Sequence, residues 1–174
     1  LLQEQGKSSR LLSSLDFLRL SKDSAPDEVF LAERINQQIS DSTEVEIFVA
    51  QGFICRNAFG EISNLKRGGS DYSASLFGAA IDCEEVQIWT DIDGMHNNDP
   101  RYIEYTHPIR ELSFDEAAEL AYFGAKILHP SSIKPTRKKN IPVRLKNTLE
   151  PEAEGTLISN ESSSRGIKAV AAKS

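Results

Sequence analysis

The sequence predicts an α/β protein, a three-layer αβα sandwich around a mainly parallel sheet. Segments of strand character alternate with segments of helical periodicity from residue 27 onward, an order that is typical of such folds. The first expected strand, residues 44–50, begins with alternation and becomes continuously apolar, as a strand covered on both faces does. With 174 residues, the chain is long enough for one full core or for part of a larger domain.

One clear helix is expected in the N-terminal part. Residues 1–23 are polar with scattered leucines that fit neither the helical nor the strand period, so they receive no element. Residues 24–27 combine a hydroxyl cap, an early proline and an acid, which predicts a helix start there and an end at residues 40–42. Its buried face is expected to carry the apolar residues at helical spacing, Val29, Ala32, Ile35 and Ile39.

The middle of the chain predicts a hairpin, a helix and a strand. Residues 57–64 are polar and contain a glycine, which favours a hairpin or loop. Residues 72–80 are small and apolar, as in a helix that packs closely against a sheet. Residues 85–89 have the composition of a second strand.

The C-terminal part continues the alternation. Ser113 followed by Glu116 is the signature of a capping box, so a helix is expected to run from there to about Phe123. A short helix and two further strands are expected at residues 131–138, 141–145 and 155–158. Residues 160–165 are Ser-rich and linker-like, and residues 167–170 would begin a new strand.

A cation, two glycines, a hydroxyl and a carboxylate follow one another in Arg67, Gly68, Gly69, Ser70 and Asp71, directly before the small-residue helix. Glycines let the backbone approach a ligand, and a helix start offers N–H groups and positive dipole character to an anion. The same residues could also form a simple tight turn capped by Ser70 or Asp71. Both interpretations remain open on these residues alone.

Three polar loops are expected at the carboxyl ends of strands or after the capped helix, at residues 51–53, 90–101 and 126–130. Ligands of open α/β sheets bind at such an edge. If the loops converge there, the site would hold Arg67, Arg101 and Lys126 as cations and Asp71 and Asp91 as anions. That mixture suits a phosphorylated ligand together with a small carboxylate. Thr90 and Asp91 could instead cap a turn, and Lys126 could pair with a helix dipole.

Composition excludes several classes of function. A net charge of -6 argues against a general nucleic-acid surface. The two cysteines, Cys55 and Cys83, lie far apart and suggest neither a zinc site nor a disulfide framework, and the histidines show no metal-ligand spacing. The isolated cysteines are therefore expected to be reduced thiols of a cytoplasmic protein. No apolar run approaches the roughly 20 residues of a membrane helix.

Several motifs in order resemble the C-terminal half of the catalytic domain of the aspartate kinases, within the amino acid kinase family. They are QGFI at 51–54, RGGSDYSA at 67–74, WTD at 89–91, DPR at 99–101, FDEAAELAYFGAK at 114–126, LHP at 128–130, IPV at 141–143 and GT at 155–156. Several motifs in the same order are far more specific than any single one.

The resemblance implies transfer of the ATP γ-phosphoryl group to the β-carboxylate of L-aspartate, with Mg²⁺ bridging the phosphates. It implies the first step of lysine, threonine and methionine biosynthesis and a homo-oligomeric full-length protein. Carried over by motif, the aspartate-binding residues are Arg67, Gly68, Gly69 and Ser70. Asp71 would be the catalytic residue that organises the site. The nucleotide contacts would come from Thr90, Asp91, His96, Arg101 and Lys126.

The sequence departs from the family pattern at three residues. His96 stands where the family often has Tyr, Lys66 replaces a usual Gly and Asp93 a frequent Pro. The family's N-terminal Lys-Phe-Gly-Gly segment is not in this chain. We therefore expect residues 1–160 to be the C-terminal part of a kinase domain that is inactive alone, and 161–174 a linker and the first strand of an ACT regulatory domain. The alternatives are another amino acid kinase, or a catalytically incompetent nucleotide-binding or assembly fragment.

Overall fold

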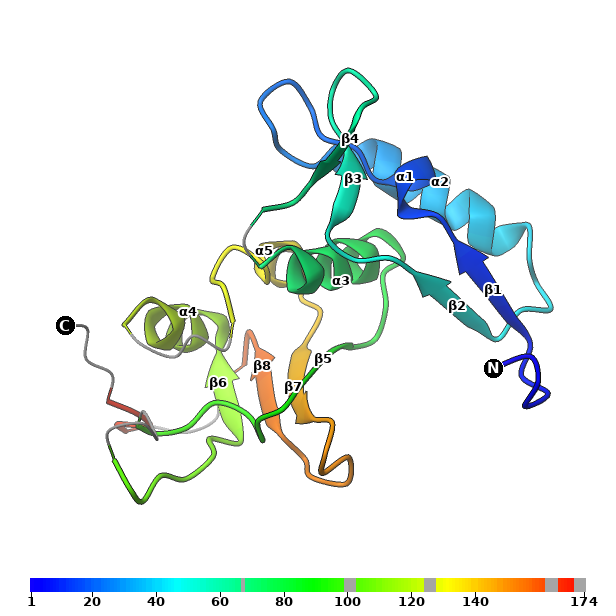
Figure 1. Cartoon of the computed structure of the whole chain (residues 1–174). Coiled ribbons are helices and arrows are strands. Elements are labelled where there is room, and N and C mark those ends of the chain that lie inside the picture. The colour runs from blue at the N-terminus through cyan, green and yellow to red at the C-terminus, as the bar shows by residue number, and fades with distance from the viewer. Residues whose placement is uncertain (67, 99–102, 124–127, 162–165, 171–174) are drawn as a thin grey trace. The chain divides into compact units, whose positions relative to one another are not determined.

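The computed structural model describes residues 1–66, 68–98, 103–123, 128–161 and 166–170 (Figure 1). The chain divides into two compact units, Leu1–Ile81 and Asp82–Ser174. Each unit contains both helices and strands, which confirms the α/β class. Three expected site residues, Arg67, Arg101 and Lys126, lie outside the described residues, as do Gly124 and most of the expected linker.

The first unit holds two small sheets and three helices. Its elements are β1 (Ser9–Leu12), α1 (Ser14–Phe17), α2 (Glu28–Ser40), β2 (Ile47–Ala50), β3 (Ile54–Arg56), β4 (Ile62–Asn64) and α3 (Gly69–Ala80). Strands β1 and β2 pair in parallel, whereas β3 and β4 form an antiparallel hairpin. The hairpin and α3 confirm the predictions for residues 57–64 and 72–80.

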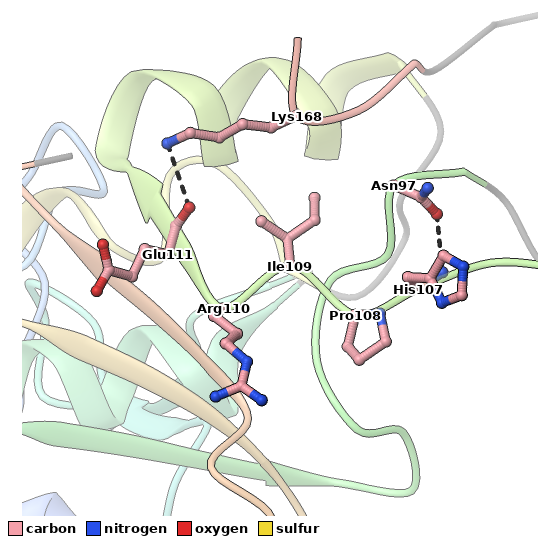
Figure 2. Close-up of a pocket in the computed structure, with 7 residues that line it drawn as sticks. All are labelled: Asn97, His107, Pro108, Ile109, Arg110, Glu111 and Lys168. Carbon is pink, nitrogen blue, oxygen red and sulfur yellow. Dashed lines mark hydrogen bonds between the residues drawn. The ribbon is translucent and has the colours of Figure 1, made fainter. Parts of the chain in front are cut away.

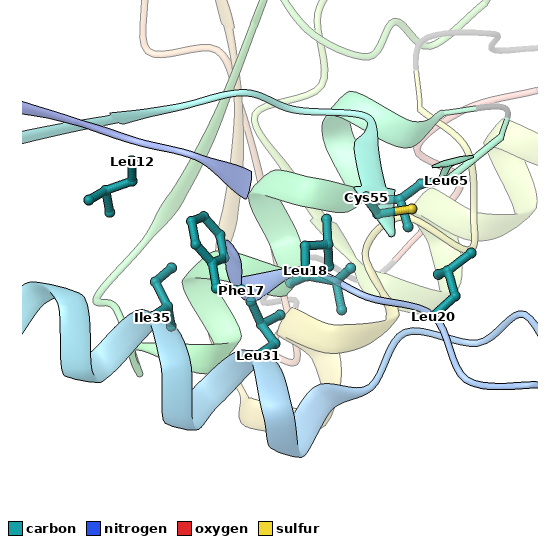
Figure 3. Close-up of a cluster of buried hydrophobic side chains, with 9 residues drawn as sticks. Leu12, Phe17, Leu18, Leu20, Leu31, Ile35, Cys55 and Leu65 are labelled. Carbon is teal, nitrogen blue, oxygen red and sulfur yellow. The ribbon is translucent and has the colours of Figure 1, made fainter. Parts of the chain in front are cut away.

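Apolar side chains from nearly every element of the first unit meet in one core (Figure 3). Its buried members are Leu12, Phe17, Leu18, Leu20, Leu31, Ile35, Cys55, Leu65 and Leu76. The ring of Phe17 packs edge-on against that of Phe77, with centroids 5.2 Å apart. Burial raises the pKa of the Cys55 thiol, so this cysteine behaves as a small apolar core residue.

Helix α2 begins later than expected, and its buried face is rotated. Its N-cap is Asp27, whose carboxylate accepts a hydrogen bond from the Phe30 amide at 3.1 Å, rather than Ser24. Arg19 holds the same carboxylate at 2.7 Å. The bond from Phe30 and the pairing with Arg19 lower the pKa of Asp27. Leu31 and Ile35 are therefore buried, while Val29, expected in the core, is 70% exposed.

Two further expectations for the first unit were incomplete. Residues 1–23, left without an element, form β1 and α1. The expected strand at 44–50 shortens to β2, which pairs only with β1 among the described residues. Val49 of β2 is 43% exposed, so this strand is not covered on both faces within its unit.

The second unit is built on a mixed four-stranded sheet. Its elements are β5 (Val86–Thr90), β6 (Glu111–Ser113), α4 (Phe114–Phe123), α5 (Lys134–Lys139), β7 (Val143–Asn147) and β8 (Thr156–Ser159). The strand order is β5-β7-β8-β6, with β7 antiparallel to β8 and the other two pairs parallel. All predicted strands between 85 and 158 are confirmed, and β6 is an additional one.

The capping box of α4 forms as predicted. The Ser113 amide donates to Glu116 Oε2 at 2.7 Å, and the Glu116 amide donates to Ser113 Oγ at 3.1 Å. Because Ser113 is also the last residue of β6, the strand leads into the helix without a loop. Residues 167–170 were expected to start a strand, but they belong to none.

The turn between β7 and β8 requires a glycine at residue 155. Gly155 has φ 72°, and a Cβ there would lie 1.9 Å from the Leu145 carbonyl oxygen. We expect Gly155→Ala to lower the free energy of unfolding by about 3 kcal/mol, since left-handed strain and overpacking add. Urea titration measures the change. Gly166→Ala is the control, because Gly166 also has a positive φ but a Cβ there meets no atom within 4 Å. Equal losses in the two variants would contradict the steric explanation.

Candidate functional site

The glycine motif forms a left-handed turn that opens directly into α3. Lys66 and Gly68 have φ values of 61° and 71°, and the Gly69 amide donates to the Lys66 carbonyl at 3.1 Å. Gly68 is the N-cap and Gly69 is the first helical residue. A tight turn and a helix start thus coexist, and the glycine N-cap offers no side chain to the first amides of the helix.

A second turn, residues 51–53, lies against this helix start. A Cβ on Gly52 would lie 3.4 Å from Ser70 Cα, and a Cβ on Gly69 would lie 2.5 Å from Phe53 Cδ2. The Phe53 ring therefore occupies the space that a side chain at residue 69 would need. Ser70 is exposed beside this contact. The structure thus brings the expected loop at 51–53 together with the glycine motif.

Asp71 lies in the first turn of α3. It is partly buried, and burial raises the pKa of its carboxyl. Removal of the carboxyl from water disfavours its charged form and so causes this shift. A carboxylate with a perturbed pKa beside a ligand-accessible helix start is typical of a functional site.

The second group of expected residues follows β5. The Thr90 hydroxyl donates to the Ile92 carbonyl at 3.1 Å and accepts from the Ile92 amide at 3.2 Å, so it caps a turn. Asp91 is exposed. Both ring nitrogens of His96 are engaged, Nε2 with Asp93 Oδ1 at 2.6 Å and Nδ1 with Thr106 Oγ1 at 2.7 Å.

Thr156, a buried residue of β8, makes hydrogen bonds that support the loop after β5. Thr156 Oγ1 accepts from the Met95 amide at 2.9 Å and donates to the Ile109 carbonyl at 2.6 Å. A Cβ on Gly94 would lie 2.4 Å from the same oxygen, so glycine lets the loop lie on the threonine. The Ile109 amide donates to the Met95 carbonyl at 2.7 Å and closes the arrangement.

The sequence did not predict the two supporting residues, Ser73, which accepts a hydrogen bond from the Phe53 amide, and Thr156. A threonine directly after Gly155 in the matching GT pair was the only sequence signal for Thr156. The glycine motif belongs to the first unit, whereas Thr90, Asp91 and His96 belong to the second. Their convergence at one sheet edge stays a prediction.

The second unit contains two hollows, which lie on either side of Lys168 and not at the expected site. Their volumes are about 440 and 350 Å³, and both include Lys168 in their lining. Lys168 Nζ donates to the Glu111 carbonyl at 3.2 Å (Figure 2). It also donates to Glu116 Oε2 at 2.8 Å. Burial raises the pKa of Glu116, but Lys168 and the Ser113 amide outweigh it, so the net shift is downward. None of the expected site residues that the structure describes lines either hollow.

No three His, Cys, Asp or Glu side chains of the described part gather as a metal site would require. None of its helices has both the length and the apolar character needed to cross a membrane.

Comparison with known proteins decides the family. The model of the amino acid kinase family matches residues 1–147. The chain belongs to the amino acid kinase family. This membership agrees with the order of motifs from residue 51 to residue 156.

Within this family, the similar curated proteins include aspartokinases. Aspartokinase 1, chloroplastic, of Arabidopsis thaliana is 50% identical over 99 residues, which cover 57% of this chain and 17% of that protein. Lysine-sensitive aspartokinase 3 of Escherichia coli is 40% identical over 136 residues, 78% of this chain and 30% of that protein. The chain thus spans less than a third of either relative.

A solved structure of E. coli aspartokinase III in complex with aspartate and ADP superposes with a TM-score of 0.87 and 35% identity. The match covers 97% of this chain and 38% of that one. The structural similarity to that aspartokinase therefore extends over almost the whole chain.

The raised pKa of Asp71 predicts a pH-dependent stability. At a pH between 3.8, the ordinary pKa of an aspartate carboxyl, and the raised pKa of Asp71, this carboxyl keeps its proton in the native state but has lost it in the unfolded chain. The free energy of unfolding therefore falls as pH rises through this range. At higher pH the native state carries the full cost of ionising the partly buried carboxyl. We expect Asp71→Asn to be more stable than the wild type at pH 7 and to lose this advantage below pH 3.8. Urea titrations at both pH values measure it, with exposed Asp23→Asn as the control. A gain of the same size at both values would contradict the burial explanation.

Proposed function

We propose that this chain is part of an aspartate kinase. The similarity to E. coli aspartokinase III, whose solved structure holds aspartate and ADP, carries the proposal. In the proposed reaction, a β-carboxylate oxygen of L-aspartate bonds to the γ-phosphorus of ATP. The bond from that phosphorus to the β,γ-bridging oxygen breaks, and ADP and 4-phospho-L-aspartate are released. Such a transfer depends on positioning and charge stabilisation.

The start of α3 would form the acceptor side. Gly68, Gly69 and Ser70 would present backbone N–H groups and a hydroxyl to aspartate, and Arg67 would pair with a carboxylate. Two observations support this role: the N-cap has no side chain, and Ser70 is exposed. Asp71, partly buried one residue further, would organise the reacting groups as the catalytic residue.

The loop after β5 would form the nucleotide side. Thr90, Asp91 and His96 would contact the nucleotide, and Arg101 and Lys126 would add positive charge for its phosphates. The bonds from His96 to Asp93 and Thr106 support this proposal, because they hold the loop in one conformation before ATP binds. A preformed loop loses less entropy on binding.

Mg²⁺ would accompany ATP and neutralise phosphate charge. This ion is commonly held by one or two carboxylates together with substrate phosphates, so it needs no cluster of protein ligands. Single carboxylates among the described residues, such as that of the exposed Asp91, fit that requirement.

The wider assignments are parts of the same proposal. Residues 1–160 would complete a kinase domain, and 161–174 would lead to an ACT regulatory domain. The whole protein would be a cytoplasmic homo-oligomer in the pathway to lysine, threonine and methionine. The names of the aspartokinase relatives support the biosynthetic role.

The acceptor is tested by extending the chain to the length of its relatives and measuring ADP release with a panel of acceptors. We expect turnover with L-aspartate, and none above background with glutamate, N-acetylglutamate or UMP.

Replacing Asp71 with Asn should lower kcat at least about a hundredfold, as loss of a positioned charged group does. Turnover with another acceptor but not with aspartate would refute the proposal. The 174-residue chain alone is expected to be inactive.

The nucleotide side is tested by calorimetric titration with ATP. We expect His96→Ala to raise the Kd for ATP about five- to tenfold, because the ring and the loop order that it maintains are lost. His107→Ala is the matched control, since His107 is an exposed histidine of the same unit. Equal affinities of the wild type and the His96 variant would exclude a role for His96.

A further inference from the structure

The turn at residues 51–53 contains a strained backbone. Phe53 has φ 70°, and the Ile54 amide donates to the Gly52 carbonyl across it at 2.8 Å. This bond closes the three-residue turn 52–54, in which Phe53 is the middle residue. A bulky residue with positive φ at that position is uncommon and costs free energy. A conformation of this kind persists only where surrounding contacts stabilise it.

Ser73 supplies one of these contacts from inside α3. Its hydroxyl accepts a hydrogen bond from the Phe53 amide at 2.8 Å and donates one to the Gly69 carbonyl at 2.7 Å. The side chain is only 1% exposed, so water cannot readily replace it. One buried oxygen thus joins the turn and the first residue of α3.

Other bonds fix the two ends of the turn. The Leu65 amide donates to the Phe53 carbonyl at 2.9 Å. On the other side, the Ser14 amide donates to Gln51 Oε1 at 3.0 Å, and the Ser14 hydroxyl donates to the Gln51 carbonyl. The Phe53 amide donates to the hydroxyl of Ser73, so this bond restrains the backbone at the strained residue itself.

The turn contacts the residues that would bind the acceptor. Gly52 lies against Ser70, and the Phe53 ring lies against Gly69. A relaxation of φ at Phe53 would move both contacts at once, because Gly52 and Phe53 share a peptide bond. The position of Ser70 relative to the turn therefore depends on the bond from Phe53 to Ser73.

We propose that Ser73 is a positioning residue, whose buried hydroxyl holds the strained turn against the start of α3 and so shapes the aspartate-binding surface. The proposal rests on the proposed function for its substrate. Its geometric part, the restraint of the turn, is independent of any activity.

The same helix contains a control for this proposal. Ser75 is also fully buried, two residues further along α3, but its Oγ has no hydrogen-bond partner among the residues that the structure describes. Replacing either serine with alanine removes one hydroxyl from the interior of the same helix. Only the Ser73 substitution removes the restraint on Phe53.

The first measurement is steady-state kinetics of Ser73→Ala and Ser75→Ala in the extended protein of the acceptor assay. For Ser73→Ala we expect the KM for aspartate to rise about tenfold, the factor for one lost hydrogen bond, with the KM for ATP unchanged within about twofold. Ser75→Ala should leave both values unchanged. A merely structural serine would alter both KM values together or neither.

The second measurement is hydrogen exchange of peptides that contain Phe53, on the same proteins. We expect exchange of this segment to be about tenfold faster in Ser73→Ala and unchanged in Ser75→Ala. Unchanged exchange would overturn the restraint itself. Faster exchange with an unchanged KM for aspartate would overturn the link to the acceptor.

Failure of the proposed function would look different. A wild-type protein that does not phosphorylate aspartate would refute the function and, with it, the aspartate-binding part of the inference. The exchange experiment would still decide whether Ser73 restrains the turn.

Discussion

The arrangement of the first unit depends on the contact between the Phe53 ring and the start of α3, which a side chain at residue 69 would block. Because Gly69 has no side chain, the Phe53 ring of the turn at 51–53 lies directly on the first turn of α3, and Gly52 lies against Ser70. The strand before the turn, β2, pairs with β1, and the strand after it, β3, contributes Cys55 to the core. The glycine turn that opens α3 therefore has a defined position relative to the sheet and the core, which a ligand site requires.

Both units use a buried hydroxyl to organise an irregular loop. Ser73 serves the Phe53 amide and the Gly69 carbonyl, while Thr156 serves the Met95 amide and the Ile109 carbonyl. A hydroxyl can donate and accept at once, so one small side chain satisfies two backbone groups away from water. The expected acceptor and nucleotide sides thus share one structural solution, with a glycine close by in each case.

Local signals in the sequence predicted much of the fold. The capping box at Ser113 and Glu116, the hairpin and α3 are encoded by neighbouring residues, and they form as expected. The errors occur where distant contacts decide. Strand β1 is defined by pairing with β2, more than thirty residues later, and Arg19 helps to place the cap of α2 at Asp27. Motif order identified the candidate site residues. The left-handed backbone conformation of Phe53 and the hydrogen bonds of Ser73 depend on tertiary structure, and no sequence pattern predicts them.

The burial of Cys55 has a practical consequence. This thiol lies in the core, two residues after the strained Phe53. Because its pKa is raised, only a small fraction of it is thiolate. An alkylating reagent can reach it only when the first unit opens. The rate of its modification would therefore report the opening equilibrium around the turn, so the chain contains its own chemical probe of local unfolding.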